Sequence, residues 1–181
     1  MTGALLALTL AGGGISLASP AGASTAAWAN GPARDAAKVV PFSGHYKGKA
    51  ALLINNGAVT ISSVTGKGTG SLVGASTITG KGSGASTAQC DPFTGTGSII
   101  GAAAKLSLHV VESKSSGCSS GQSGPVTVTF TGLAVVTGGS GKAGGASGNL
   151  KFNGSLKLGG TSGSQNGSYT VALTGNLKIK G

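Results

Sequence analysis

The sequence has few charged, acidic or aromatic residues. Of its 181 residues, 9% are charged, 4% are aromatic and only three are acidic. The acidic residues are Asp35, Asp91 and Glu112, and the two histidines are His45 and His109. A hydrolytic triad, a pair of glycosidase carboxylates or a metal cluster needs more such groups than these. We therefore expect no catalytic residues, no metal site, no cofactor and no enzymatic activity.

Proline is also scarce, with 5 residues, whereas glycine accounts for 36. No strict Gly-x-y period runs through the chain, which excludes a collagen triple helix. Disorder is the more serious alternative, because Leu, Ile, Val and Phe together number only 39. The mean hydropathy is nonetheless +0.25, and apolar residues alternate regularly in the second half of the chain. Disordered chains are typically less hydrophobic and more charged, so we expect a folded protein.

The first 23 residues have the features of a secretory signal peptide. An apolar stretch rich in leucine ends at Pro20, and Ala21-Gly22-Ala23 supplies the small residues that precede a cleavage site. A second candidate cleavage site follows Ala29, and no Lys or Arg precedes the apolar stretch. We expect residues 1–23 to be removed, 24–41 to form a flexible lead-in and 42–181 to form a single β-barrel domain. The mature protein is expected to be secreted or at the cell surface, with no transmembrane segment.

Only two cysteines occur, Cys90 and Cys118, and both lie in Gly/Ser-rich sequence. In an exported protein we expect them to pair, and the chain-entropy relation assigns such a disulfide about 3–4 kcal/mol. Metal ligation is the alternative. Two thiols without nearby histidine or acidic partners make a poor metal site, so the disulfide is favoured.

From residue 42 onward, short alternating apolar runs separated by glycine predict β-strands and turns. Asn56-Gly57 is typical of a two-residue hairpin turn. We expect a turn at 89–97 and a loop at 114–124. About eight antiparallel strands favour an all-β fold, an antiparallel β-barrel, with a β-sandwich as the alternative. The expected strands are 45–55, 59–67, 76–88, 97–100, 105–113, 126–136, 149–158 and 169–180.

A short motif, Gly-x-x-x-Gly-Ala followed by Ser or Ala, occurs three times. The spacings between its copies are unequal, so it does not indicate a solenoid. No phosphate-binding or dinucleotide-binding pattern accompanies it. We interpret its glycines as structural turns that need glycine dihedral angles: Gly70, Gly74, Gly97, Gly101, Gly141 and Gly145.

The third copy lies in a longer segment, which runs from Val136-Thr137-Gly138-Gly139-Ser140-Gly141 through Gly145-Ala146-Ser147-Gly148 to Phe152. This segment resembles one in the allene oxide cyclase and dirigent β-barrels, and in bacterial secreted proteins of unknown function. The resemblance implies an eight-stranded barrel and a bacterial extracellular location. It covers a structural turn and places no catalytic residue of those families on this chain, and a shared fold does not imply a shared function.

Basic residues outnumber acidic ones by 13 to 3. Lysines on the strand parity opposite the apolar residues would share one outer patch if the first and last strands pair to close the barrel. Such a face predicts binding of an anionic polymer, for example a cell-wall glycan, with a merely solubilising surface as the alternative. Nucleic acid is a weaker candidate, because no aromatic residues interleave with the lysines. These lysines are Lys47, Lys49, Lys151, Lys157, Lys178 and Lys180.

Three functions follow as alternatives. The first is a secreted, non-enzymatic β-barrel that acts as a surface or cell-wall binding module. The second is a carrier of a small apolar ligand, indicated by in-facing aliphatic and small residues, and a solidly packed interior would exclude it. The third, which only the resemblance implies, is isomerisation of a fatty-acid epoxide or guidance of phenoxy-radical coupling. None of the three predicts an oligomeric state.

Overall fold

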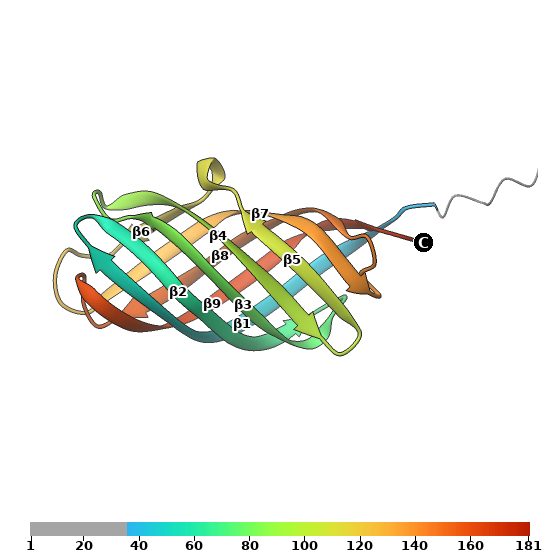
Figure 1. Ribbon diagram of the computed structural model, residues 1–181, viewed down its shortest axis with the longest axis horizontal. Coiled ribbons are helices and arrows are strands. Elements are labelled where there is room, and N and C mark those ends of the chain that lie inside the picture. The colour runs from blue at the N-terminus through green and yellow to red at the C-terminus, as the bar shows by residue number, and fades with distance from the viewer. Residues whose placement is uncertain (1–35) are drawn as a thin grey trace, which may run out of the picture. The chain divides into compact units, whose positions relative to one another are not determined.

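The computed structural model describes residues 36–181, and nearly all of them lie in antiparallel strands (Figure 1). This confirms the all-β prediction. A single turn of 3-10 helix, η1 (Glu112–Lys114), is the helical element among these residues. The strands are β1 (Lys38–Asn55), β2 (Ala58–Gly70), β3 (Gly74–Ala85), β4 (Cys90–Gly101), β5 (Ala104–Val110), β6 (Ser116–Ser119), β7 (Val126–Gly141), β8 (Ser147–Leu158) and β9 (Gly163–Ile179).

Eight of the strands close into a barrel. Their order is β3-β2-β1-β9-β8-β7-β5-β4, and pairing of β3 with β4 completes the circle. The first and last strands, β1 and β9, pair along 17 positions from Lys38↔Ile179 to Ile54↔Gly163. The structure thus contains the predicted barrel rather than the sandwich. Closure gives each of the eight strands a partner on both sides. It therefore removes the exposed edge strands that could aggregate, in a chain with few charges to prevent such pairing.

The ninth strand, β6, completes the wall where β5 is too short to do so. β5 and β6 both lie between β4 and β7, and η1, which projects from the barrel in Figure 1, connects them. β5 pairs with Gly95–Ile100 of β4, whereas β6 pairs with Cys90–Pro92 of β4. On the other side, β6 pairs with Val128–Thr131 of β7.

The structure corrects three boundaries. Lys38–Pro41, expected in the lead-in, already belong to β1 and pair with Asn176–Ile179 of β9. Residues 89–97, expected to be a turn, are mostly part of β4, and the loop expected at 114–124 contains β6. Backbone pairing with neighbouring strands makes these segments extended, although their Gly, Ser and Thr residues give little apolar alternation. The predicted signal peptide and residues 24–35 lie outside the described part of the chain.

The turns at one end of the barrel fold inward and plug it. In the β2–β3 turn Val73 is 2% exposed, and in the β7–β8 turn Ala143 and Ala146 are 0% and 2% exposed. The first and third copies of the glycine motif form these two turns. Their glycines at 74, 141 and 145 have positive φ, as predicted for turns, and Gly70 ends β2. Gly101 ends β4, but Gly97 lies inside β4 rather than in a turn.

The core fills this plugged end. The in-facing alternation predicted for 126–136, 149–158 and 169–180 is confirmed by buried side chains on β7, β8 and β9. We call this half of the barrel the packed end. Its largest fully buried side chains are Phe42, Ile99, Leu106, Leu150, Leu177, Val73 and Val136.

Candidate ligand cavity

The other half of the barrel contains a cavity of about 570 Å³. We call this half the open end. It carries the predicted Asn56-Gly57 hairpin, in which both residues have positive φ, together with the β3–β4, β6–β7 and β8–β9 connections. Residues of these connections, including Gln89, Gln122 and Thr161, line the cavity. The volume lies within the range of roughly 300–1,000 Å³ that is typical of small-molecule sites.

Aliphatic side chains form one wall of the cavity. Leu52 of β1, Val126 of β7 and Leu158 of β8 are 5–7% exposed and pack as a cluster separate from the main core. These strands are long and alternate strictly, so each contributes an apolar side chain at every second position. The partly buried residues that pack against the cluster are Ile54, Val59, Ile61, Val128 and Leu156, and all of them line the cavity.

Glycine backbone forms much of the facing wall. In β3 and β4 the positions that alternate inward are largely glycine, and they pair with each other across the two strands. An added Cβ at Gly95 would lie 2.7 Å from the carbonyl oxygen of Lys81, and one at Gly82 would meet that of Thr94. The absence of side chains therefore lets the strands approach closely and leaves the space in front of them empty. The glycines of this wall are Gly80, Gly82, Gly84, Gly95 and Gly97.

Three phenylalanines line the cavity where it meets the core. The ring centroids of Phe93, Phe130 and Phe152 lie 5.9–6.4 Å apart. All three line the cavity and also contact the core. Phe130 is paired with Gly154 and Phe152 with Gly132, so each ring covers a glycine on the neighbouring strand. This packing gives the cavity an aromatic floor.

Tyr169, one of the lining residues, carries a buried polar group. Its side chain is 6% exposed, and its hydroxyl lies against Gly66 of β2. Within residues 36–181 this hydroxyl is the one buried side-chain polar atom that lacks a hydrogen-bond partner. Burial raises the pKa of Tyr169 to about 12. The phenol is therefore neutral at physiological pH and can donate its proton to a hydrogen bond.

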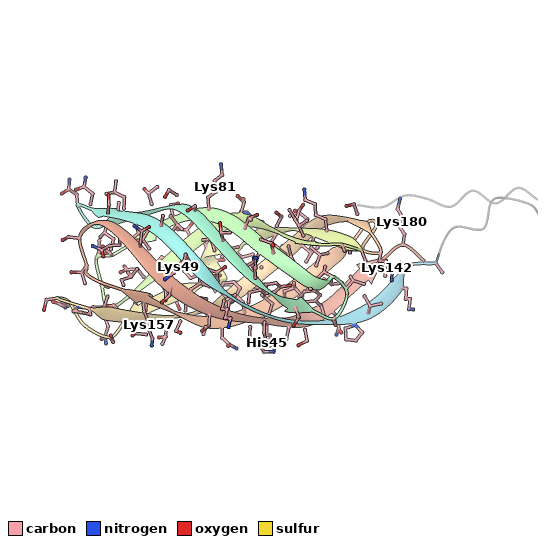
Figure 2. The ribbon with its side chains drawn as sticks, turned by 90° about the horizontal axis from the view of Figure 1, so that it is seen from below. His45, Lys49, Lys81, Lys142, Lys157 and Lys180 are labelled. Carbon is pink, nitrogen blue, oxygen red and sulfur yellow. A yellow bond between two sulfur atoms is a disulfide. The ribbon has the colours of Figure 1, made fainter. Side chains whose placement is uncertain are left out.

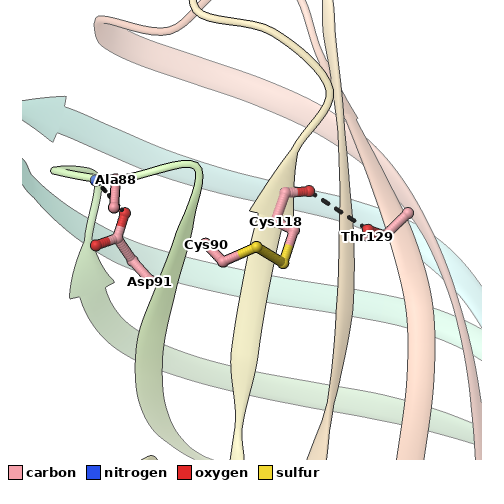
Figure 3. The surroundings of a disulfide bond; sticks show 5 residues. All are labelled: Ala88, Cys90, Asp91, Cys118 and Thr129. Carbon is pink, nitrogen blue, oxygen red and sulfur yellow. Dashed lines mark hydrogen bonds between the residues drawn. A yellow bond between two sulfur atoms is a disulfide. The ribbon is translucent and has the colours of Figure 1, made fainter.

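The rim of the cavity is held by hydrogen bonds and by a disulfide (Figure 3). The Asp91 carboxylate accepts the backbone N–H of Ala88 at 2.9 Å and both the N–H and the hydroxyl of Thr87, at 3.0 and 2.9 Å. These bonds, that from Ala88 first, hold the pKa of Asp91 below its ordinary value of 3.8. The predicted disulfide is present: Cys90 and Cys118 are directly paired and join β4 to β6.

The structure brings only some of the predicted lysines together. Lys49 and Lys157 both pair with Ser168 and flank it on the outer face, at the open end (Figure 2). Lys47 lies directly opposite Lys67, a residue that the prediction did not include. Lys151 lies nearer the packed end of β8 than Lys157 does. Lys178 is near the end of β9 at the packed end, and Lys180 contacts the β7–β8 turn there. Six lysines thus share an outer face but not one compact patch.

The sequence reasoning missed the glycine wall and the Tyr169 hydroxyl. Strand parity is the signal that could have found the glycines, since positions 80, 82 and 84 are glycine at every second residue. Their consequence depends on barrel closure, which sets β3 and β4 opposite the aliphatic wall.

No family model, curated protein or solved structure matches the chain. Residues 36–181 contain no group of three or more His, Cys, Asp and Glu side chains placed to hold a metal ion. In that same range no helix is long and apolar enough to span a membrane.

Proposed function

We propose that the protein binds a small, neutral, mostly apolar molecule in the cavity at the open end of the barrel. The main support for this proposal is the cavity itself. Side chains fill the packed end of the barrel, whereas about 570 Å³ is left empty at the open end. Aliphatic and aromatic side chains dominate the lining, and an apolar ligand would gain roughly 25 cal/mol for each Å² of its surface that leaves water.

The distribution of charge favours a neutral ligand. Lys81 and Asp91 are the charged residues beside the cavity. Lys81 is exposed and points away from the barrel interior in Figure 2, and the Asp91 carboxylate already accepts three hydrogen bonds from the rim turn. A charged ligand would lose its hydration without an opposite charge to pair with, which is strongly unfavourable.

A fluorescence titration tests this proposal. N-phenyl-1-naphthylamine, a neutral apolar probe that brightens in apolar surroundings, should bind the wild type at one saturable site. Val128→Trp places a large ring in the cavity and should abolish this binding. Thr129→Trp, one residue along β7 on the exposed outer face, is the matched control and should bind like the wild type. Equal binding by both variants would show that the probe sits elsewhere.

A second proposal concerns the outer face at the open end. Like charges directly opposite each other on neighbouring strands are destabilising, yet Lys47 lies opposite Lys67, and Lys49 and Lys157 flank one serine. An anionic polymer would relieve this repulsion. Polygalacturonate should bind in a salt-sensitive way, and Lys49→Ala/Lys157→Ala should weaken it. Lys105→Ala/Lys114→Ala removes the same charge from elsewhere and should leave binding unchanged.

We also propose that the protein works outside the cell. The Cys90–Cys118 disulfide supports this location, because such bonds persist in oxidising compartments. Sequencing the amino terminus of protein recovered from culture medium tests it, and the expected first residue is Ser24. Recovery of the uncleaved chain only from inside the cells would contradict it.

A further inference from the structure

The geometry points to a specific ligand class: a mostly apolar molecule with a carbonyl, ether or hydroxyl oxygen that accepts a hydrogen bond from the Tyr169 hydroxyl. This inference rests on the proposed function, since it assigns the polar contact within the same cavity. It makes Tyr169 the residue that selects among apolar ligands.

The unpaired hydroxyl is the first observation. A buried polar group without a hydrogen-bond partner is destabilising, and native structures contain few of them. The other described tyrosine shows what the same barrel does elsewhere: Tyr46, at the packed end, is 3% exposed, and its hydroxyl lies 3.0 Å from the Ser76 hydroxyl. The fold therefore satisfies the tyrosine in its core and leaves unsatisfied the one that lines the cavity.

The surroundings of the hydroxyl are the second observation. It lies against Gly66, where an added Cβ would overlap it, so the glycine provides the space that the phenol occupies. The in-facing side chains beside Gly66 are apolar: Ile78 is its partner on β3, and Val64 is the preceding in-facing residue of β2. Ile78, Val64 and Tyr169 all line the cavity. Because the hydroxyl oxygen is covered in this conformation, a molecule inside the cavity supplies its partner once the phenol turns toward the cavity.

The protonation state fixes the direction of the bond. Because burial raises the pKa of Tyr169 to about 12, the hydroxyl keeps its proton and acts as a donor. Its complement is an acceptor oxygen rather than an anion, in agreement with a lining whose lysine, Lys81, is exposed and points away from the barrel interior (Figure 2). A single donor in an apolar lining fixes one end of the ligand and leaves the remainder to shape and apolar contact.

A matched pair of ligands tests the inference. Benzophenone and diphenylmethane share a skeleton and differ in having a carbonyl or a methylene group between the rings. Each is titrated, by displacement of N-phenyl-1-naphthylamine, into the wild type, Tyr169→Phe and Tyr46→Phe. The wild type should prefer benzophenone by about tenfold, as one hydrogen bond near the upper end of the usual range gives. Tyr169→Phe should lose this preference, and Tyr46→Phe, the matched control, should keep it.

A spectroscopic readout on the wild type makes the test independent of how the variants fold. The infrared carbonyl stretch of benzophenone should move to lower frequency in the wild-type complex, relative to its position in hexane, and should return to it in Tyr169→Phe. If both ligands bind equally well to the wild type and to Tyr169→Phe, and the stretch is unshifted, the inference is overturned while the proposed function stands. If neither ligand displaces the bound probe, the inference is likewise overturned, and if the probe itself does not bind the wild type, the proposed function fails as well.

Discussion

Removing the disulfide should destabilise the barrel and open its cavity. Cys90 and Cys118 lie 28 residues apart in sequence, and the bond closes that loop in the unfolded chain. The chain-entropy relation for such a loop gives about 12 cal/mol/K, or about 3.6 kcal/mol at 25 °C. Cys90→Ala/Cys118→Ala should therefore lower the free energy of unfolding by about 3–4 kcal/mol.

The effect should concentrate at the open end. β6 has only four residues, and without the crosslink its backbone pairing with β4 and β7 alone holds it in the wall. β6 and the loop after it supply Gly117, Ser119 and Gly121 to the cavity lining. We expect the affinity for N-phenyl-1-naphthylamine to fall even under conditions in which the barrel as a whole stays folded. The reason is that β6 can leave the wall locally before the barrel unfolds.

Urea denaturation followed by circular dichroism in the strand region measures the stability change. Wild type treated with a reductant serves as a control, because it loses the same crosslink without any substitution and should match the double variant. A loss below about 1 kcal/mol, outside the typical range for native disulfides, would refute the reasoning. So would an unchanged probe affinity, because β6 would then stay in place without its crosslink.

Three further substitutions have expected outcomes in urea denaturation. Gly154→Ala should lower the free energy of unfolding by about 1–3 kcal/mol, because its Cβ would overlap the backbone oxygen of Thr170 and lie 2.6 Å from the Phe130 ring, whereas Gly138→Ala, with nothing within 4 Å, should have little effect. Leu150→Ala, at a 0% exposed position of the packed end, should cost about 2–5 kcal/mol and leave probe affinity intact. The hydrogen bonds to Asp91 stabilise the fold above its ordinary pKa of 3.8 and are lost as pH falls through its lower folded pKa. The difference in stability between wild type and Asp91→Asn should therefore disappear only in acid.

Strand alternation made much of the barrel predictable. In β7, β8 and β9 every second residue is apolar or glycine, so the face toward the core was evident from the sequence. The Asn56-Gly57 turn and the disulfide were predictable because each depends on local chemistry. β4 and β6 were missed because their Gly, Ser and Thr residues are extended through pairing with distant strands, a cause that no local pattern records.

The cavity depends on closure of the barrel, so no local sequence pattern could predict it. In-facing glycines such as Gly82 and Gly95 suggest a bend or a close approach, but the empty volume appears only when the bare wall faces Leu52, Val126 and Leu158 across the barrel. For the lysines, the local pattern was informative and only their arrangement along the barrel was not. Their outward parity was correct, whereas their spread along the barrel follows from the β1–β9 and β8–β9 registers.

Methyl-resolved NMR spectroscopy during a titration with benzophenone shows which part of the barrel binds an apolar molecule. The methyl signals of Leu52, Val128 and Leu158, at the open end, should shift saturably and show contacts with the ligand. Those of Leu150 and Leu177, in the packed end, should remain in place. Unperturbed signals at all five residues, or shifts confined to outward-facing residues, would contradict the claim that the open end of this barrel binds apolar molecules.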